Sequence, residues 1–234
     1  FLMRLVFASF ICLLGALFPA VGASQDQPVV VELFTSQGCS YCPPADAYLN
    51  ELAKQPNVIA LAWHVDYWDY IGWKDSFANP AFTERQRAYA HAQKQRMIYT
   101  PQLIINGVEN MMGKIYDEVS ASIRKVTVQK AVMKLSSSRA GAAYTVTLSA
   151  SHRHGTYDVQ LVRVSPINIV KILGGENAGK TVTYVNVVTD LRSLGSWDGQ
   201  GKVTFKTGDL VRGKYTILVQ HQGHGKIVAA AWLK

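Results

Sequence analysis

The stretch PVVVELFTSQGCSYCPPADAYLNELAK, residues 28–54, decides the fold that this sequence predicts. Its beginning, Pro28 to Phe34, is apolar and rich in β-branched residues, which predicts a buried strand. Its end, Pro43 to Lys54, has prolines in its first turn and predicts a helix with one buried face. Cys39 and Cys42 form a C-x-x-C motif at the turn between the two elements. The apolar positions of the helix are Ala47, Leu49, Leu52 and Ala53.

The chain continues to alternate strands and helices after this stretch. An apolar strand ends in an Asn-Gly turn, which is a hairpin signal. The resulting order is strand, helix, strand, helix, strand, strand, helix, which is that of a thioredoxin fold. The further elements expected are a strand over Val58–Val65, a helix over Pro80–Arg96, a strand over Thr100–Gly107, its partner over Val108–Met112 and a helix over Tyr116–Thr127.

From Ala131 onward, short alternating or β-branched runs are separated by turns rich in Gly, Asn and Asp, which predicts an all-β sandwich. The sequence therefore predicts an α/β thioredoxin fold over residues 24–128, followed by a β-sandwich domain over residues 129–234. The expected strands are Tyr144–Ser149, Tyr157–Val164, Lys180–Val188, Lys202–Phe205, Lys214–Gln220 and Lys226–Leu233, with Val132–Leu135 and Ile169–Leu173 as edges.

The first residues differ from the rest of the chain. Arg4 is their only charge, Leu5 to Phe18 is an apolar run, and Val21 to Ala23 supplies small residues. This pattern predicts a signal peptide over residues 1–23, cleaved after Ala23. A run of about 14 apolar residues is too short to cross a bilayer as a helix, so we expect no permanent membrane anchor. The protein should be periplasmic or secreted.

Composition excludes several classes of protein. Hydrophobic residues make up 48% of the chain and charged residues 17%, which excludes disordered and collagen-like proteins. Only 3 cysteines are present, too few for a disulfide scaffold. Lys and Arg number 14 against 5 Asp and Glu in residues 129–234. These cations are dispersed along strand-like sequence rather than clustered, so we expect no nucleic-acid partner.

Three motifs carry a family resemblance. Cys39-Ser40-Tyr41-Cys42 is similar to the C-x-Y-C of glutaredoxins, and Thr100-Pro101 before an apolar strand resembles the cis-proline element of the thioredoxin superfamily. Together, TSQGCSYCPPAD, WHVDYWDYIGWKD and YTPQLIING resemble an uncharacterised family of secreted bacterial thioredoxin-like proteins. The resemblance implies that the backbone of Thr100 pairs with an extended peptide beside the reactive sulfur. Pro43 and Pro44, directly after Cys42, depart from the usual pattern of the superfamily.

The position of the C-x-x-C predicts its chemistry. At a helix start, unpaired N–H groups and the helix dipole stabilise a thiolate. We therefore expect Cys39 to be the exposed nucleophile and Cys42 to be the buried resolving thiol. A structural disulfide and half of a zinc site remain the alternatives. We expect no bound metal and no cofactor.

Aromatic residues gather after the second predicted strand. Tyr67, Trp68, Tyr70 and Trp73 lie at a strand end, where open α/β folds bind ligands. They could form a substrate rim or pack against the β-sandwich. The substrate-binding residues that we expect are Tyr41, Trp68, Thr100 and Pro101.

Histidines are interpreted as structural or solvent-exposed. His64 is expected to be a core or strand-end residue. The other histidines of interest lie at turn positions, where solvent exposure is favoured over copper or zinc binding. They are His152, His154, His221 and His224.

Two functions follow from these observations. The favoured one is an extracytoplasmic thiol:disulfide oxidoreductase that uses Cys39 and Cys42. Its partners would be protein or small-molecule thiols and disulfides, including a redox partner protein. The alternative is a non-catalytic envelope binding protein that recognises its partner through the basic β-domain.

Overall fold

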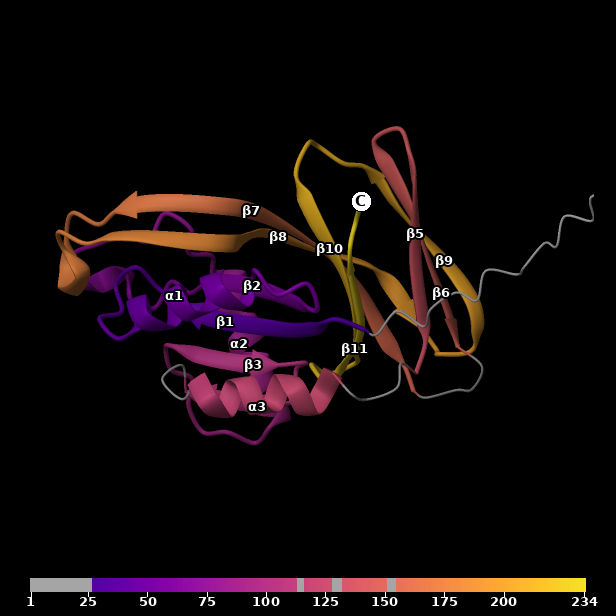
Figure 1. The fold of residues 1–234 in the computed structure, drawn as a ribbon, viewed down its shortest axis with the longest axis horizontal. Coiled ribbons are helices and arrows are strands. Elements are labelled where there is room, and N and C mark those ends of the chain that lie inside the picture. The colour runs from indigo at the N-terminus through magenta and orange to yellow at the C-terminus, as the bar shows by residue number, and fades with distance from the viewer. Residues whose placement is uncertain (1–26, 113–115, 128–131, 151–154) are drawn as a thin grey trace, which may run out of the picture.

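The computed structural model describes residues 27–112, 116–127, 132–150 and 155–234 (Figure 1). The predicted signal peptide and its cleavage after Ala23 lie outside the described residues. So do the predicted domain boundary near Gln129 and the loop histidines His152 and His154. No helix in the described ranges is long and apolar enough to span a membrane.

The first half of the chain forms the elements that the sequence predicts, in the predicted order. Helix α2 ends four residues earlier than expected, at Ala92. A short 3₁₀ helix, η1 (Asp69–Ile71), lies within the aromatic segment. The elements are β1 (Val29–Thr35), α1 (Cys42–Leu52), β2 (Val58–His64), α2 (Pro80–Ala92), β3 (Gln102–Ile105), β4 (Glu109–Met112) and α3 (Tyr116–Thr127).

The second half consists of strands, with one 3₁₀ helix, η2 (Gly175–Asn177). Two strands are much longer than predicted, with 15 residues in β7 and 17 in β8. The predicted edge strand near Ile169 is the far end of β7. The strands are β5 (Lys134–Ala140), β6 (Ala143–Ala150), β7 (Tyr157–Lys171), β8 (Thr181–Trp197), β9 (Gly201–Asp209), β10 (Lys214–His221) and β11 (Ile227–Trp232).

The predicted fold class is wrong, because one mixed sheet runs through both halves of the chain. Its eight strands have the order β11-β10-β7-β8-β2-β1-β3-β4, and a second sheet has the order β5-β6-β9. Strand β2 pairs in parallel with β1 and, through Ala62 and Val187, with β8. In a thioredoxin fold followed by a separate sandwich, the strands of the first half and the strands of the second half would lie in different sheets.

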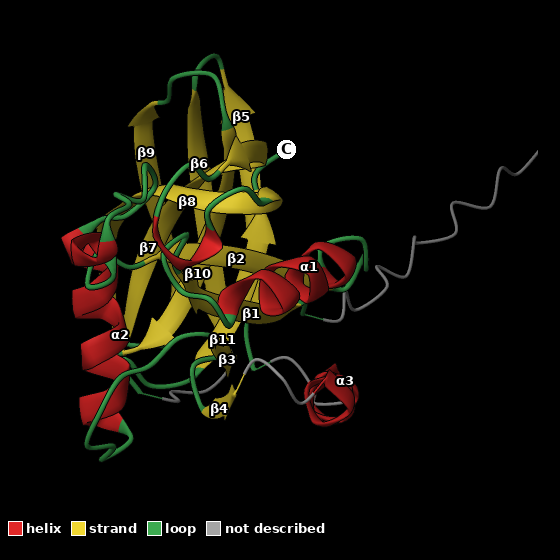
Figure 2. Cartoon of the chain, turned by 90° about the vertical axis from the view of Figure 1, so that its left-hand side faces the viewer, coloured by secondary structure: helices red, strands yellow, loops and turns green. Residues whose placement is uncertain are grey.

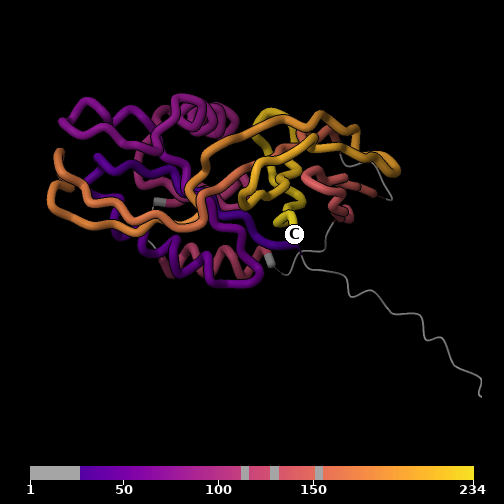
Figure 3. Tube along the Cα trace, turned by 90° about the horizontal axis from the view of Figure 1, so that it is seen from above, coloured from indigo at the N-terminus to yellow at the C-terminus, as the bar shows by residue number. Residues whose placement is uncertain are grey.

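The length of β7 and β8 explains this difference. Near its start, β7 pairs with β10 from Tyr157 to Val164, and beyond that point its partner is β8 alone. The two strands continue as a hairpin arm over β2 and α1, to the left in Figures 1 and 3. Alternation in sequence identifies such strands but does not show which neighbour they choose.

Helices cover both faces of the large sheet (Figure 2). Helices α1 and α3 pack on one face, and α2 packs on the other. Strand β1 is buried on both faces, as its apolar run predicts. In α1, Leu49 and Leu52 are buried as expected, whereas Ala47 is exposed and the neighbouring Asp46 is buried.

The three-stranded sheet packs on the other end of the large sheet in a sandwich-like arrangement. Its inner residues Val146 and Leu148 share a core with Leu161 of β7 and Ile217 of β10. This part of the molecule agrees with the β-rich pattern of the sequence.

A buried hydrogen-bond network around an ion pair links the two halves of the chain. Arg85 Nε donates to Glu32 Oε1 at 2.8 Å, and Tyr89 OH donates to Glu32 Oε2 at 2.5 Å. Gln220 of β10 donates from Nε2 to Tyr89 OH at 2.8 Å. All four residues are buried, so each depends on the others for its hydrogen bonds. Division of the chain into the domains 24–128 and 129–234 stays a prediction.

Candidate functional site

Cys39 and Cys42 form a disulfide at the turn between β1 and α1. The turn is closed by backbone bonds from Cys39 N–H to Ser36 O, at 3.2 Å, and from Cys42 N–H to Cys39 O, at 3.1 Å. Helix α1 begins at Cys42, with a proline in its first turn. The predicted pair is therefore present, in its oxidised form.

The tip of the hairpin arm covers this turn. Asn177 is 1% exposed, and its amide Nδ2 donates to Gln37 O at 2.9 Å and to Cys39 O at 2.8 Å. Lys180 Nζ donates to Asn177 Oδ1 at 2.8 Å, which leaves Nδ2 facing the turn. Residues almost 140 positions apart in the sequence are thus joined at the disulfide.

The aromatic segment closes the turn from another side. A Cβ on Gly38 would lie 3.1 Å from Trp68 Cβ, so glycine lets Trp68 approach the backbone beside Cys39. Trp73 Nε1 donates to Gln37 Oε1 at 2.8 Å. A Cβ on Gly174, next to η2, would lie 2.6 Å from Gly72 O. The aromatic segment therefore packs both on the disulfide turn and on the hairpin arm.

Both sulfur-bearing residues are buried in this form. Cys39 and Cys42 are each 0% exposed. The expectation that Cys39 is exposed is therefore wrong for the disulfide form. Sequence spacing placed Cys39 before the helix, but it could not reveal that Asn177 binds its backbone carbonyl group or that the residue is buried.

The structure brings together most of the predicted substrate-binding residues. The Thr100–Pro101 peptide bond is cis, as the resemblance implies. Trp68 Nε1 donates to Thr100 Oγ1 at 2.7 Å, which joins the aromatic segment to the proline element. Tyr41 lies at the start of α1 with 63% of its surface exposed. Their roles in substrate binding stay predictions.

A carboxyl group is buried next to the disulfide along α1. Asp46 is four residues after Cys42, which places both on one face of the helix, and it is 2% exposed. Thr35 Oγ1 donates to Asp46 Oδ1 at 2.8 Å, while Oδ2 has no partner among the described residues. Burial raises the pKa of Asp46 to about 7, and the nearby His64 and the Thr35 hydrogen bond limit the rise.

A buried histidine and aspartate lie beside this carboxyl group. His64 Nδ1 and Asp75 Oδ2 are 2.7 Å apart, and the same Asp75 oxygen accepts the Gln37 N–H at 2.8 Å. The His64 ring packs against Tyr184, with centroids 4.8 Å apart. His64 Nε2 has no partner among the described residues. His64 is thus a buried strand-end residue, as predicted, and Asp75 connects it to the disulfide turn.

Comparison with known proteins places the chain in a family. Residues 30–220 match the family described as protein of unknown function (DUF1223). The chain belongs to the DUF1223 family. Protein AGR_C_4864 from Agrobacterium tumefaciens is 34% identical, with a TM-score of 0.73 over 88% of this chain and 93% of that chain.

A second solved structure resembles this DUF1223 protein in fold. HBP35 of Porphyromonas gingivalis gives a TM-score of 0.65 at 16% identity, over 89% of this chain and 75% of that chain. Among curated proteins, none matches significantly. The predicted resemblance to an uncharacterised family is confirmed, because DUF1223 is a family of unknown function.

Sequence reasoning missed three residues of this DUF1223 site. The sequence did contain a sign of Asp46, because a carboxyl group among the apolar, inward-facing positions of a predicted helix is unusual. Asp75 follows the aromatic segment as one of several acidic residues there, so nothing distinguished it. Asn177 had no signal, since its part in the site depends on the path of the hairpin arm.

Proposed function

We propose that this protein is a thiol:disulfide oxidoreductase that uses Cys39 and Cys42. The observation that carries the proposal is a disulfide at the start of α1 with a buried carboxyl group, Asp46, one helical turn beyond it. A purely structural bridge between residues three apart closes a small loop and needs no such group. The C-x-Y-C and cis-proline elements resemble those of the thioredoxin superfamily, which supports the same activity.

The proposed exchange moves two electrons. In reduced protein, the Cys39 thiolate attacks a substrate disulfide, forms a mixed disulfide and releases the first substrate sulfur as a thiolate. The Cys42 thiol then loses its proton and attacks Cys39 Sγ, which releases the second substrate thiolate and forms the Cys39–Cys42 bond. The cysteines lose the two electrons that the substrate disulfide gains. Run in reverse, the same steps oxidise a substrate dithiol.

We assign the proton of Cys42 to Asp46. A carboxyl group with a pKa of about 7 is partly ionised at neutral pH and can accept and return a proton there. The nearby His64 and the Thr35 hydrogen bond both favour ionised Asp46, because each lowers its pKa against the effect of burial.

Substrate access requires the cover over Cys39 to open. Asn177 and Trp68 both contact the backbone of the turn. We propose that the tip of the hairpin arm moves away during exchange and that Thr100, Pro101, Trp68 and Tyr41 then line the exposed sulfur.

A redox titration of the purified protein against glutathione tests the proposal. The reduced and oxidised forms should interconvert with a defined potential, which also assigns the direction of the exchange. The Cys42→Ser variant should accumulate mixed disulfides through Cys39, whereas Cys39→Ser should trap nothing. Failure of the dithiol to reoxidise, or equal trapping by both variants, would refute the activity.

A second candidate function is favoured by the complete burial of both cysteines in the disulfide. In that case the protein is a non-catalytic envelope binding protein, and its basic half recognises the partner. Replacement of both cysteines by alanine separates the two functions, because a binding protein retains partner binding and an oxidoreductase loses turnover. We further propose that the chain is exported with removal of residues 1–23, which N-terminal sequencing of the exported protein would test.

A further inference from the structure

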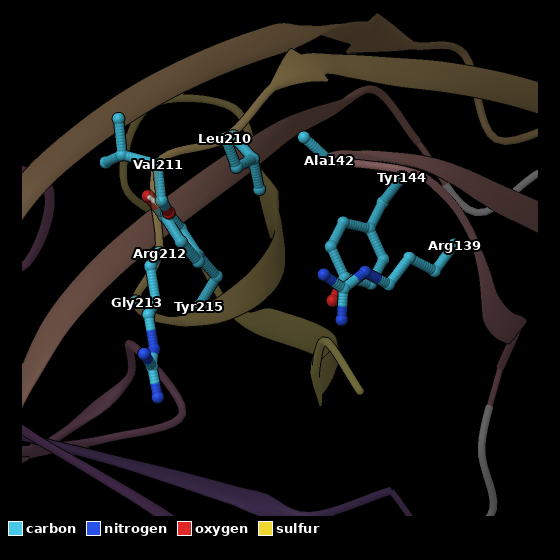
Figure 4. Close-up of a pocket in the computed structure, with 8 residues that line it drawn as sticks. All are labelled: Arg139, Ala142, Tyr144, Leu210, Val211, Arg212, Gly213 and Tyr215. Carbon is cyan, nitrogen blue, oxygen red and sulfur yellow. Dashed lines mark hydrogen bonds between the residues drawn. The ribbon is translucent and has the colours of Figure 1, made fainter.

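A pocket lies between the two sheets, away from the disulfide (Figure 4). Its volume is about 390 Å³, within the range of small-molecule sites. One wall comes from the end of β5 and the start of β6, and the other comes from the turn between β9 and β10. The lining residues are Arg139, Ala142, Tyr144, Leu210, Val211, Arg212, Gly213 and Tyr215.

Hydrogen bonds fix both walls of the pocket. Leu210 N–H donates to Ala142 O at 3.0 Å and holds the two turns together. Tyr215 is 6% exposed, and its OH donates to Val211 O at 3.0 Å, which fixes its ring against the turn. Tyr144 N–H donates to Thr207 Oγ1 at 2.9 Å. The pocket is therefore part of the folded framework of the two sheets.

Two arginine residues line the pocket, one on each wall. Arg139 Nε donates to Gly141 O at 2.9 Å, and its guanidinium lies 5.7 Å from the centre of the Tyr144 ring. This arrangement orients Arg139 while its Nη donors bind no described residue. Arg212 lies on the opposite wall, and its side chain likewise has no described partner. A guanidinium presents a planar fork of donors that matches a carboxylate or a phosphate.

The surroundings of the pocket add positive charge. Arg163 of β7 donates from Nη2 to Arg212 O at 3.4 Å, and a Cβ on Gly213 would lie 3.1 Å from Arg163 Nε. Glycine at this position therefore lets a third guanidinium approach the turn. None of these three arginines forms an ion pair with a described residue. The nearest carboxylate along the chain, Asp209, is exposed and does not line the pocket.

We propose that this pocket binds a small organic anion. A carboxylate or phosphate would be held between Arg139 and Arg212, and an attached ring or short apolar body would pack against Tyr144 and Leu210. The site is independent of the disulfide and of the activity proposed for it. The anion is either a free metabolite or a lipid headgroup, since both present the same chemistry to the arginines.

Isothermal titration calorimetry of the full protein with phenyl phosphate and with benzoate tests the proposal by measuring the heat of binding. We expect saturable binding that weakens as sodium chloride is added. The variants Arg139→Gln and Arg212→Gln should each weaken binding about tenfold or more, because each loses charge-assisted hydrogen bonds. Both side chains are exposed, so both variants should unfold at the wild-type urea midpoint. The matched control is Arg192→Gln, an exposed arginine 3.8 Å from Asp190 and outside the pocket, which should bind as the wild type does.

Vesicles containing phosphatidylglycerol distinguish the two sources of the anion. Vesicle binding that phenyl phosphate displaces supports a lipid headgroup, and binding of phenyl phosphate without vesicle binding supports a free anion. The proposal is overturned if neither aromatic anion binds, if benzyl alcohol binds equally well, or if Arg192→Gln weakens binding as much as Arg212→Gln.

Discussion

Replacement of Asp46 by asparagine should change how stability depends on pH. The carboxyl group is 2% exposed, and its oxygen Oδ2 has no hydrogen-bond partner among the described residues. Asparagine has nearly the same shape and cannot ionise, so it can retain the Thr35 hydrogen bond through Oδ1. The variant therefore removes the charge while the packing of α1 is preserved.

The expected magnitude follows from the pKa of Asp46. The pKa is about 7 in the folded protein, against an ordinary value of 3.8 in the unfolded chain. Between these pH values the folded protein holds a proton that the unfolded chain has released, so stability falls as pH rises. A shift of about three pKa units corresponds to about 4 kcal/mol. The loss begins near pH 4 and is complete somewhat above pH 7.

Urea unfolding of the oxidised protein measures this effect. The reference value is the difference between the free energies of unfolding of Asp46→Asn and wild type at pH 4.5. Between pH 4.5 and pH 8.5 the variant should gain about 3 kcal/mol relative to the wild type, because about 1 of the 4 kcal/mol is already lost by pH 4.5. Asp190→Asn, which removes an exposed carboxylate, should show no such trend. A difference between Asp46→Asn and wild type that is constant from pH 4.5 to 8.5 would show that Asp46 ionises normally and would remove it from the proposed proton transfer.

Three further predictions concern the cover, the ion pair and the domains. Asn177→Ala should speed reduction of the disulfide by dithiothreitol by up to about 30-fold, because two hydrogen bonds worth about 1 kcal/mol each are lost. The control Asn50→Ala loses its hydrogen bond to Thr183 O in the same hairpin and should leave the rate unchanged. Arg85→Leu should lower the free energy of unfolding by about 3–5 kcal/mol in urea titrations, since it leaves Glu32 buried without its cation. The double variant Arg85→Leu with Glu32→Leu should lose less free energy of unfolding, because it leaves no unpaired buried charge. A fragment of residues 24–128 should be insoluble on expression, because strands of the second half complete both hydrophobic cores of the large sheet. A soluble fragment that unfolds cooperatively would instead support the predicted independent domains.

The sequence by itself determined the elements of the first half of this protein and the place of its cysteine pair. The β-branched run before Cys39 predicted β1, and the prolines after Cys42 predicted the start of α1. These features are local, because they depend on backbone propensities and on periodicity within a few residues. The cis bond before Pro101 was implied by a resemblance between short motifs and needed no tertiary information.

Only the tertiary structure decided how the two halves combine. Strand β8 could have paired within a separate sandwich, but it joins β2 and carries Asn177 onto the disulfide turn. Cys39, whose carbonyl group Asn177 binds, is fully buried in this arrangement. Periodicity tells which side chains face an apolar layer, but the partner of that layer depends on contacts between residues more than 100 positions apart. The shielding of the disulfide and the raised pKa of Asp46 are therefore properties of the fold.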